Sequence, residues 1–331
     1  MLNNLNILLP EVFLTLSIFS ILMIGVFIKN SFNLIFNLSS LILIITIGII
    51  LNNPNNQEKI FLDSFTRDGF SNFFKIMILI SSLFVLNSSK NYILDNKLGK
   101  FEYPIIILLS ILGMFFMVSS NDIILFYLGL ELQSLSLYIL ASMDRDNLKS
   151  SESGIKYFVL SALSSGLLLY GCSLLYGFTG STNFDLIADQ LNKDNTGAVF
   201  AMVFILVGLA FKVSAVPFHM WTPDVYEGAP TAITSYFAVV PKVAGFAVLI
   251  KFMLIPFSNI LAEWQTIIIF MSIASMILGS VAAIGQKNIK RLLAYSSIGH
   301  IGYALAGVAT GVVSGYELSL IHISEPTRLN P

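Results

Sequence analysis

Charged residues are scarce in this chain of 331 residues, because Asp, Glu, Lys and Arg together make up only 11% of it. Soluble domains carry roughly 25% charged residues. Hydrophobic residues make up 56% of the chain, and the mean hydropathy is +0.82. A soluble chain of this length cannot bury so much apolar surface. The composition therefore excludes a soluble enzyme, a disordered protein and a nucleic-acid-binding protein, and it indicates a polytopic membrane protein.

The chain also lacks the motifs of soluble redox and nucleotide-binding proteins. Its single cysteine, Cys172, lies in an apolar run and cannot by itself form an internal disulfide or hold an iron–sulfur cluster. No Gly-x-Gly-x-x-Gly turn and no Walker-type loop occurs. The N-terminal residues contain neither a basic segment nor a small-residue cleavage site, so we expect the first apolar span to remain in the mature chain.

Ten stretches are long and apolar enough to cross about 30 Å of hydrocarbon, which takes about 20 residues in a helix. Backbone groups inside a bilayer must be paired within their own segment, and the alternating pattern of a membrane barrel is absent. We therefore predict an all-α fold. The predicted spans are 7–28, 33–51, 70–88, 102–119, 122–142, 154–176, 197–217, 231–254, 264–285 and 291–313.

Lysine and arginine are unevenly divided between the two sets of connections. Short cytoplasmic loops are enriched in positive charge, so we predict that the set with nine of these residues faces the cytoplasm and that the N-terminus faces outward. The other set holds Lys59, Arg67 and Lys193. The larger set comprises Lys29, Lys90, Lys97, Lys100, Arg145, Lys149, Lys287, Lys290 and Arg291.

Glu131 is an ionisable residue in the middle of the predicted span 122–142. A charged residue at the bilayer centre costs on the order of 2.5–3.5 kcal/mol on insertion scales, so such residues usually face the bundle interior and mark an ion path. Tyr127 and Ser134 lie one turn away and share its face. The alternative is a neutral, hydrogen-bonded carboxyl group that only joins helices.

Lys212 lies five residues before Pro217 and seven before His219. Proline removes a backbone donor, so we predict a kink or break in this span. Broken helices in transporters expose backbone dipoles to a wet cavity. Two interpretations of His219 remain open: a proton-carrying group, or a satisfied histidine beside an ordinary proline kink.

Three further lysines lie within predicted spans, one in the middle of a span and two near the end of one. Lys242 directly follows Pro241 in mid-span and is interpreted as functional. Lys251, nine residues later and half a rotation away, is interpreted as a lysine that snorkels to the interface. Lys156 opens the predicted span 154–176, where its position alone fits a functional and a solvated residue equally well.

His300 belongs to a polar stripe on the last predicted span, together with Ser296, Ser297 and Tyr303. Its helix also carries a small-xxx-small pair, Gly302 and Ala306, which suits close helix packing. The alternative is a packing helix with a satisfied histidine. Taken together, the ionisable residues predict a row of protonatable groups along the membrane midplane. Burial and a nearby carboxylate have opposite effects on the proton affinity of a lysine, so a changing Glu131–Lys212 distance would switch Lys212.

Two long segments resemble the signatures of a known family. Phe211–Thr231, which contains Tyr-Glu-Gly-Ala-Pro, and Gln286–Tyr303 are similar to the two signatures of the antiporter-like membrane subunits of respiratory complex I, the NADH-quinone oxidoreductase. The Tyr-Glu-Gly-Ala-Pro form of the first signature, the short N-terminal region and the Gly-Leu-Glu-Leu-Gln-Ser of Gly129–Ser134 together are most similar to the subunit N family. The mitochondrial counterpart of that family is NADH dehydrogenase subunit 2. The resemblance covers residues 1–316.

This resemblance implies a fold of fourteen helices with two inverted five-helix repeats, each containing a discontinuous helix. Ten spans would then comprise helices 1–3 in residues 1–101, the complete first repeat in 102–254 (helices 4–8) and the start of the second repeat in 255–316. The discontinuous helix would be the seventh. Residues 317–331 read like a non-native tail, and we expect the chain to be the C-terminally truncated portion of a longer protein.

The resemblance also implies roles for individual residues. Proton translocation would be carried by Glu131, Lys156, Lys212 and Lys242, with His219 and His300 as further candidates. It implies a subunit of a proton-pumping translocase coupled to quinone reduction elsewhere in the complex, without redox chemistry, cofactor or metal in this chain. NADH, FMN, iron–sulfur clusters and quinone would be bound by other subunits.

The implied partners are the other membrane-arm subunits and membrane lipid, and no nucleic acid. The implied location is the bacterial inner membrane, or the mitochondrial inner membrane if the chain is organellar. Two other functions remain open: a subunit of a multisubunit cation/proton antiporter, which shares both signatures, and a non-conducting scaffold subunit.

Overall fold

The computed structural model describes residues 6–28, 31–52, 57–191, 196–312 and 315–319. Within these residues, ten helices are long and apolar enough to cross a membrane. They are α2 (Leu9–Phe27), α3 (Phe32–Asn52), α4 (Gly69–Asp95), α5 (Glu102–Ser119), α6 (Ile123–Ala141), α7 (Leu148–Thr179), α9 (Thr196–Val213), α11 (Thr231–Leu254), α12 (Leu261–Ile284) and α13 (Ile289–Ala309).

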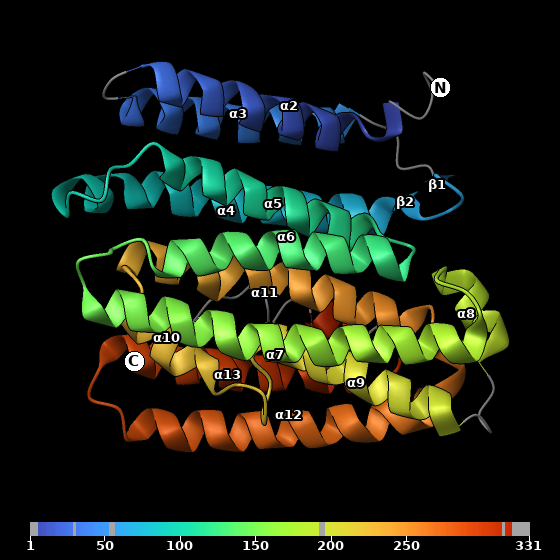
Figure 1. Ribbon diagram of the computed structural model, residues 1–331. Coiled ribbons are helices and arrows are strands. Elements are labelled where there is room, and N and C mark those ends of the chain that lie inside the picture. Colours follow the sequence, from blue (N-terminus) through green and yellow to red (C-terminus); the bar gives the residue numbers. More distant parts are fainter. Residues whose placement is uncertain (1–5, 29–30, 53–56, 192–195, 313–314, 320–331) are drawn as a thin grey trace.

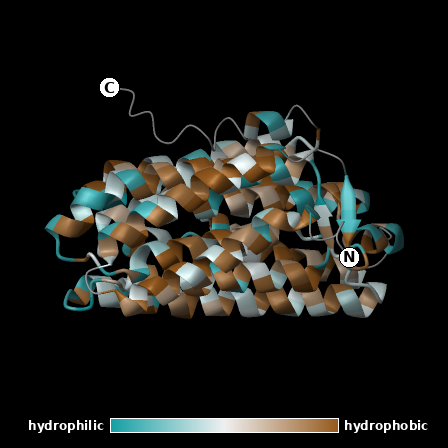
Figure 2. Ribbon diagram, turned by 90° about the horizontal axis from the view of Figure 1, so that it is seen from above, coloured by the Kyte–Doolittle hydropathy of each residue, from teal (hydrophilic) through white to brown (hydrophobic). Residues whose placement is uncertain are grey.

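The long helices lie side by side in one bundle (Figure 1). At one end, called here the hairpin end, an antiparallel pair of strands, β1 (Glu58–Ile60) and β2 (Phe65–Arg67), lies near the short helix α8 (Phe184–Gln190). At the other end, called here the elbow end, lies the short helix α10 (Trp221–Gly228). Hydrophilic residues gather at the two ends and hydrophobic residues fill the middle (Figure 2). This distribution is the one that a bilayer requires.

The chain is interrupted between α9 and α10, where the sequence predicts a break. Helix α9 ends at Val213, and Ser214 adopts a left-handed conformation with φ +66°. The indole nitrogen of Trp221 donates to the carbonyl of Phe211 at 2.9 Å, and the amide of Val216 donates to the Ser275 hydroxyl at 2.9 Å. Side chains therefore pair backbone groups that the interrupted helix leaves open, as a membrane interior demands.

Helices α5 and α6 touch backbone to backbone. A Cβ at Gly113 would lie 2.6 Å from the amide nitrogen of Gln133, and a Cβ at Gly129 would lie 2.8 Å from the carbonyl oxygen of Gly113. Any larger residue at these positions would force the helices apart. On α13, a Cβ at Gly302 would lie 2.8 Å from the amide nitrogen of Met276 on α12, so the close packing predicted around Gly302 is present.

The N-terminal helices are joined by a buried ion pair. The amine of Lys75 on α4 lies 2.5 Å from the carboxylate of Glu11 on α2, and both side chains are 2% exposed. The Lys75 amine also lies 5.3 Å from the centre of the Phe65 ring on β2. This pair lies among helices that precede the segments carrying the family signatures.

The prediction of an all-α membrane protein with ten spans and a discontinuous seventh span is confirmed. Three differences concern local structure. Helix α4 continues to Asp95, whereas the predicted span ends at 88. The sixth span begins at Leu148 rather than 154, because Asn147 caps the helix by accepting from the amide of Lys149. The β1–β2 hairpin and α8 were not predicted. Lys29, Lys193, His322 and most of the 317–331 tail lie outside the described residues.

Candidate functional site

Lys212 lies in the last turn of α9, directly before the break. Its amine donates to the hydroxyl of Ser134 on α6 at 2.6 Å and to the hydroxyl of Ser161 on α7 at 2.8 Å. The Tyr138 hydroxyl donates to the same Ser161 hydroxyl at 2.6 Å. Three helices thus converge on one amine, and the two oxygens that hold it are neutral. Such partners accept from a charged and from a neutral amine, so they do not fix its protonation state.

Glu131 lies on α6, one turn before Ser134, and its charge acts on the Lys212 amine. Its Oε1 atom is buried and has no hydrogen-bond partner among the described residues. A buried carboxyl oxygen without a partner is costly, so such an atom in a native protein calls for an explanation. Glu131 therefore shares a helix with Ser134, one of the two hydroxyls that hold the Lys212 amine.

Lys242 lies in the middle of α11 and is 4% exposed. Its amine donates to the Ser297 hydroxyl on α13 at 2.9 Å and lies 5.3 Å from the centre of the Tyr226 ring on α10. Gly245, three residues further along α11, packs against α9: a Cβ there would lie 4.0 Å from the Cβ of Lys212. Lys212 and Lys242 therefore lie on adjoining helices on either side of the break.

The two histidines occupy different settings. His219 lies between α9 and α10, half-buried, with Nδ1 buried and without a partner in the described part of the chain. His300 lies on α13, one turn after Ser297, with its ring centre 6.2 Å from that of Tyr303. His219 is thus part of the break between α9 and α10, and His300 lies one turn from the serine that accepts from Lys242.

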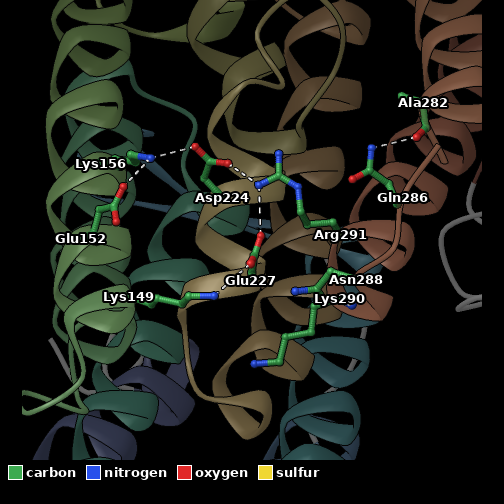
Figure 3. A network of polar contacts seen from close by, with 10 residues as sticks. All are labelled: Lys149, Glu152, Lys156, Asp224, Glu227, Ala282, Gln286, Asn288, Lys290 and Arg291. Carbon is green, nitrogen blue, oxygen red and sulfur yellow. Dashed lines mark hydrogen bonds and ion pairs between the residues drawn. The ribbon is translucent and has the colours of Figure 1, made fainter.

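Lys156 lies apart from the serine hydroxyls that hold Lys212. Its side chain is 43% exposed, and its amine contacts Glu152 at 2.7 Å and Asp224 of α10 at 3.0 Å. It belongs to a charged cluster at the elbow end, called here the elbow network (Figure 3). The network comprises Lys149, Glu152 and Lys156 on α7, Asp224 and Glu227 on α10, and Arg291 on α13.

The elbow network joins α10 to the helices on both sides of it. Arg291 contacts Asp224 at 2.8 Å and Glu227 at 3.1 Å, while Lys149 contacts Glu227 at 3.4 Å. Burial raises the pKa of Asp224, but the hydrogen bonds from Lys156 and Arg291 outweigh burial and hold the pKa below its ordinary value. The Arg291 hydrogen bond likewise lowers the pKa of Glu227. Both carboxylates are therefore charged at neutral pH.

Two buried lysines were missed or misplaced by the predictions from sequence. Lys251 is 4% exposed and donates to Thr66 and to the carbonyl of Val118, both at 3.1 Å. The prediction that it snorkels to the interface is therefore wrong. Lys75 was not singled out, although it lies inside the predicted span 70–88. The rule that singled out Lys212, an ionisable residue within a span, would have found it.

No group of three or more His, Cys, Asp or Glu side chains in the described residues could hold a metal ion. The side chains that converge on Lys212 and Lys242 are amines, a carboxyl and hydroxyls. Amines with neutral hydrogen-bond partners, near a carboxyl group, can exchange protons with water or with one another.

Comparison with known proteins supports a common origin for the whole described bundle. Residues 120–324 match the family described as "NADH:quinone oxidoreductase/Mrp antiporter, TM". NADH-quinone oxidoreductase subunit N of Pelagibacter ubique is 59% identical over 323 residues, which is 97% of this chain and 69% of that protein.

Two solved structures share the fold. A chain of respiratory complex I from Thermus thermophilus with bound aureothin has a TM-score of 0.80 and 29% identity, covering 95% of this chain and 67% of that one. A chain of the Mrp complex from a Dietzia species has a TM-score of 0.81 and 21% identity, covering 96% and 62%. The chain therefore spans about two thirds of the length of these relatives. It belongs to the NADH:quinone oxidoreductase/Mrp antiporter family of membrane subunits and, within it, to the family of NADH-quinone oxidoreductase subunit N.

Proposed function

We propose that this chain is a proton-translocating membrane-arm subunit of an NADH-quinone oxidoreductase. Protons move between Glu131, Lys212 and Lys242, and quinone reduction in other subunits drives the movement. NADH, FMN, iron–sulfur clusters and quinone belong to those subunits. The chain works beside other membrane-arm subunits and lipid, in the bacterial inner membrane or its mitochondrial equivalent.

The observation that carries this proposal is the setting of the Lys212 amine. It lies at a helix break, it is held by two serine hydroxyls from two other helices, and it feels the charge of Glu131. Moving Glu131 toward or away from it changes the Coulomb energy of the protonated amine in a medium of low dielectric constant. Lys212 thereby gains or loses a proton when the helices shift.

The remaining candidates extend this site to neighbouring helices. Lys242 and Ser297 continue it from α9 to α13, with His300 one turn further on and His219 in the break. Lys156 has a different role in this proposal. It exchanges protons at the elbow end, where Asp224 and Glu152 contact it and a cavity of about 200 Å³ adjoins it.

The test uses the full-length subunit in the assembled complex, reconstituted in vesicles. We expect Lys212→Ala and Glu131→Ala each to reduce NADH-driven proton pumping at least tenfold while the subunit still assembles. Lys287→Ala, which removes an exposed lysine at the elbow end, is the matched control and should pump normally. Wild-type pumping by both site variants would contradict the proposal and favour a scaffold role.

A cation/proton antiporter subunit is the second candidate, because the family includes the Mrp antiporters. The 21% identity to the Mrp chain supports the shared fold alone, whereas the 59% identity to subunit N favours the redox complex. Sodium-dependent proton exchange in the absence of NADH oxidation would reverse that preference.

A further inference from the structure

A second buried amine with neutral partners lies near the hairpin end, away from Lys212 and Lys242. Lys251, in the last turn of α11, is 4% exposed, and its amine donates to the Thr66 hydroxyl on β2 and to the Val118 carbonyl on α5. Lys242 and Lys251 are nine residues apart, so they lie about 13.5 Å apart along the helix and on opposite faces of it. Helix α11 thus presents one amine toward α13 and the other toward α5.

The Lys251 amine adjoins a polar cavity of about 180 Å³, called here the hairpin cavity, which has room for several water molecules. The lining is exposed at the Lys59–Asp185 ion pair, whose side chains are 43% and 46% exposed. It is buried at Lys251 and Thr66. Polar lining thus leads from solvent to a buried amine. The lining residues are Gln57, Glu58, Lys59, Thr66, Arg67, Asp68, Asn121, Asp185, Lys251 and Ile255.

The charges around this cavity balance only when Lys251 is protonated, since its lining holds three acidic and three basic side chains. Asp68 and Asp185 favour the charged amine, whereas Lys75 and Lys59 oppose it. The groups facing Lys251 are Glu58, Lys59 and Arg67 from the hairpin, Asp68 that caps α4, Lys75 from α4, and Asp185 from α8.

The nearby carboxylates are already engaged. Asp185 pairs with Lys59 at 2.6 Å and accepts from Asn121 at 2.8 Å, and Asp68 caps α4 by accepting from the Ser71 amide at 2.7 Å. Within the described residues, no carboxylate is in ion-pair contact with the Lys251 amine. Lys75, by contrast, contacts Glu11 directly. Lys251 is therefore free to exchange its proton with water that enters the cavity, whereas Lys75 has a carboxylate as its direct partner.

We propose that Lys251 is a proton-exchange site of this subunit, reached by water through the hairpin cavity. Its ammonium group releases a proton to a cavity water, leaving a neutral amine and a hydronium ion that departs past Lys59 and Asp185, and the reverse step reloads it. With the orientation predicted from the Lys and Arg distribution, this is the outward face, where pumped protons are released. The proposal rests on the proposed function and adds a release residue to it.

Activity of the reconstituted full-length complex tests the role of the amine. Lys251→Met removes the amine at similar length, and Lys251→Arg keeps a permanent positive charge that cannot be released. We expect both to pump protons at least fivefold more slowly than wild type, and Lys287→Met to pump normally. A structural role would be rescued by arginine, so wild-type pumping by Lys251→Arg would overturn the proposal. Lys212→Ala is measured in parallel, and normal pumping by that variant would contradict the proposed function. If Lys212→Ala loses pumping but both Lys251 variants pump normally, the proposed function stands and the proposal that Lys251 releases protons is wrong.

Water access is tested separately, so that the proposal stays testable if a Lys251 variant fails to assemble. Thr66→Cys and Ile255→Cys are treated with a membrane-impermeant thiol reagent in the assembled complex, and the labelled chain is analysed by mass spectrometry. Cys172, which is buried, is the internal control. We expect both introduced cysteines to react at least tenfold faster than Cys172. Reaction at position 255 without reaction at 66 would show that water stops short of Lys251 and would overturn the proposal.

Discussion

Lys75 and Lys212 are both lysines within membrane-spanning helices, and their partners differ in charge. Lys75 contacts the carboxylate of Glu11 at 2.5 Å, and both side chains are 2% exposed. Lys212 is held by two serine hydroxyls, with its carboxylate, Glu131, acting through space. A direct ion pair in a low-dielectric interior fixes both charges, because neutralising either one leaves the other uncompensated. Neutral hydroxyl partners leave the proton free to move.

Among buried lysines, the difference distinguishes a structural lysine from a proposed proton carrier by the charge of its contacts. Both residues satisfy the sequence criterion of an ionisable group within a span. Only the partner separates their roles, and the partner is a property of the folded bundle. Substitutions at the two lysines and at their partners can therefore break or sharpen this distinction.

The largest expected effect is on stability, at the direct ion pair. Glu11→Ala leaves the Lys75 charge buried without a partner, which should destabilise the subunit by about 3–5 kcal/mol. Replacing both residues, as Glu11→Leu with Lys75→Met, should recover most of that loss. The measurement is the temperature at which Cys172 of this chain becomes reactive toward a thiol reagent in the complex. Equal destabilisation in the single and double variants would show that the pair is not the reason.

The second effect is on activity and separates the two lysines directly. Arginine keeps a positive charge but is not deprotonated in proteins. Lys212→Arg should therefore reduce NADH-driven proton pumping about tenfold, whereas Lys75→Arg should preserve it within about twofold. If arginine were tolerated equally at both positions, the proposed difference between them would be wrong.

A third, smaller effect concerns one hydroxyl partner of Lys212. Ser161→Ala removes an acceptor worth about 0.7–1.4 kcal/mol, so proton pumping should fall about threefold to tenfold. Ser164→Ala is the matched control, because Ser164 lies on the same helix, is buried, and has no hydrogen-bond partner for its hydroxyl among the described residues. Similar losses in the two variants would indicate a packing effect rather than a contact with Lys212.

The smallest effect is at the elbow network, where the side chains are partly exposed and each ion pair is worth about 1 kcal/mol or less. Burial raises the pKa of Asp224, but Lys156 and Arg291 lower it by more, so that the pKa lies below its ordinary value of 3.8. The pKa of Glu227 is likewise below 4.5, with Arg291 as the main cause. A lowered carboxyl pKa adds stability that is complete above the ordinary value and is lost as the pH falls through the folded-state value.

The anchoring of α10 should therefore be constant at neutral pH and weaken only below about pH 4. Hydrogen exchange of the α10 amides, corrected for intrinsic rates and compared with α12, measures this loss. Arg291→Gln should weaken the anchoring at neutral pH and flatten its acid dependence. Unchanged α10 protection in this variant would show that the network does not hold the helix.

The part of the fold that could be predicted from the sequence follows from hydropathy and from a few single residues. Apolar length locates the ten spans, and Pro217 locates the break after Lys212. The hairpin could not be predicted, because the strands have three residues each and the turn places Phe61, Leu62 and Asp63 at positive φ without a glycine or asparagine among them. Because the hairpin was not predicted, the environment of Lys251 could not be predicted either, since its amine donates to Thr66 of β2.

Contacts between distant residues were also beyond the sequence. Lys156 shares helix α7 with Ser161, yet its amine is directed to Asp224 and that of Lys212 to Ser161. Spacing along a helix gives the face of a residue but not the element packed against that face. Asp224 and Glu227 lie within the first family signature and Arg291 within the second, so proximity of the two signatures would have been the available signal.

The glycine contact between α5 and α6 has a mechanical consequence. With backbones in contact at Gly113 and Gly129, these two helices have no room to approach further, so a movement of one presses directly on the other. One member carries the Val118 carbonyl that receives the Lys251 hydrogen bond, and the other carries Glu131 and Ser134 beside Lys212. A joint tilt of the two helices would therefore alter the surroundings of both amines at once, and would couple the proposed uptake at Lys212 to the proposed release at Lys251.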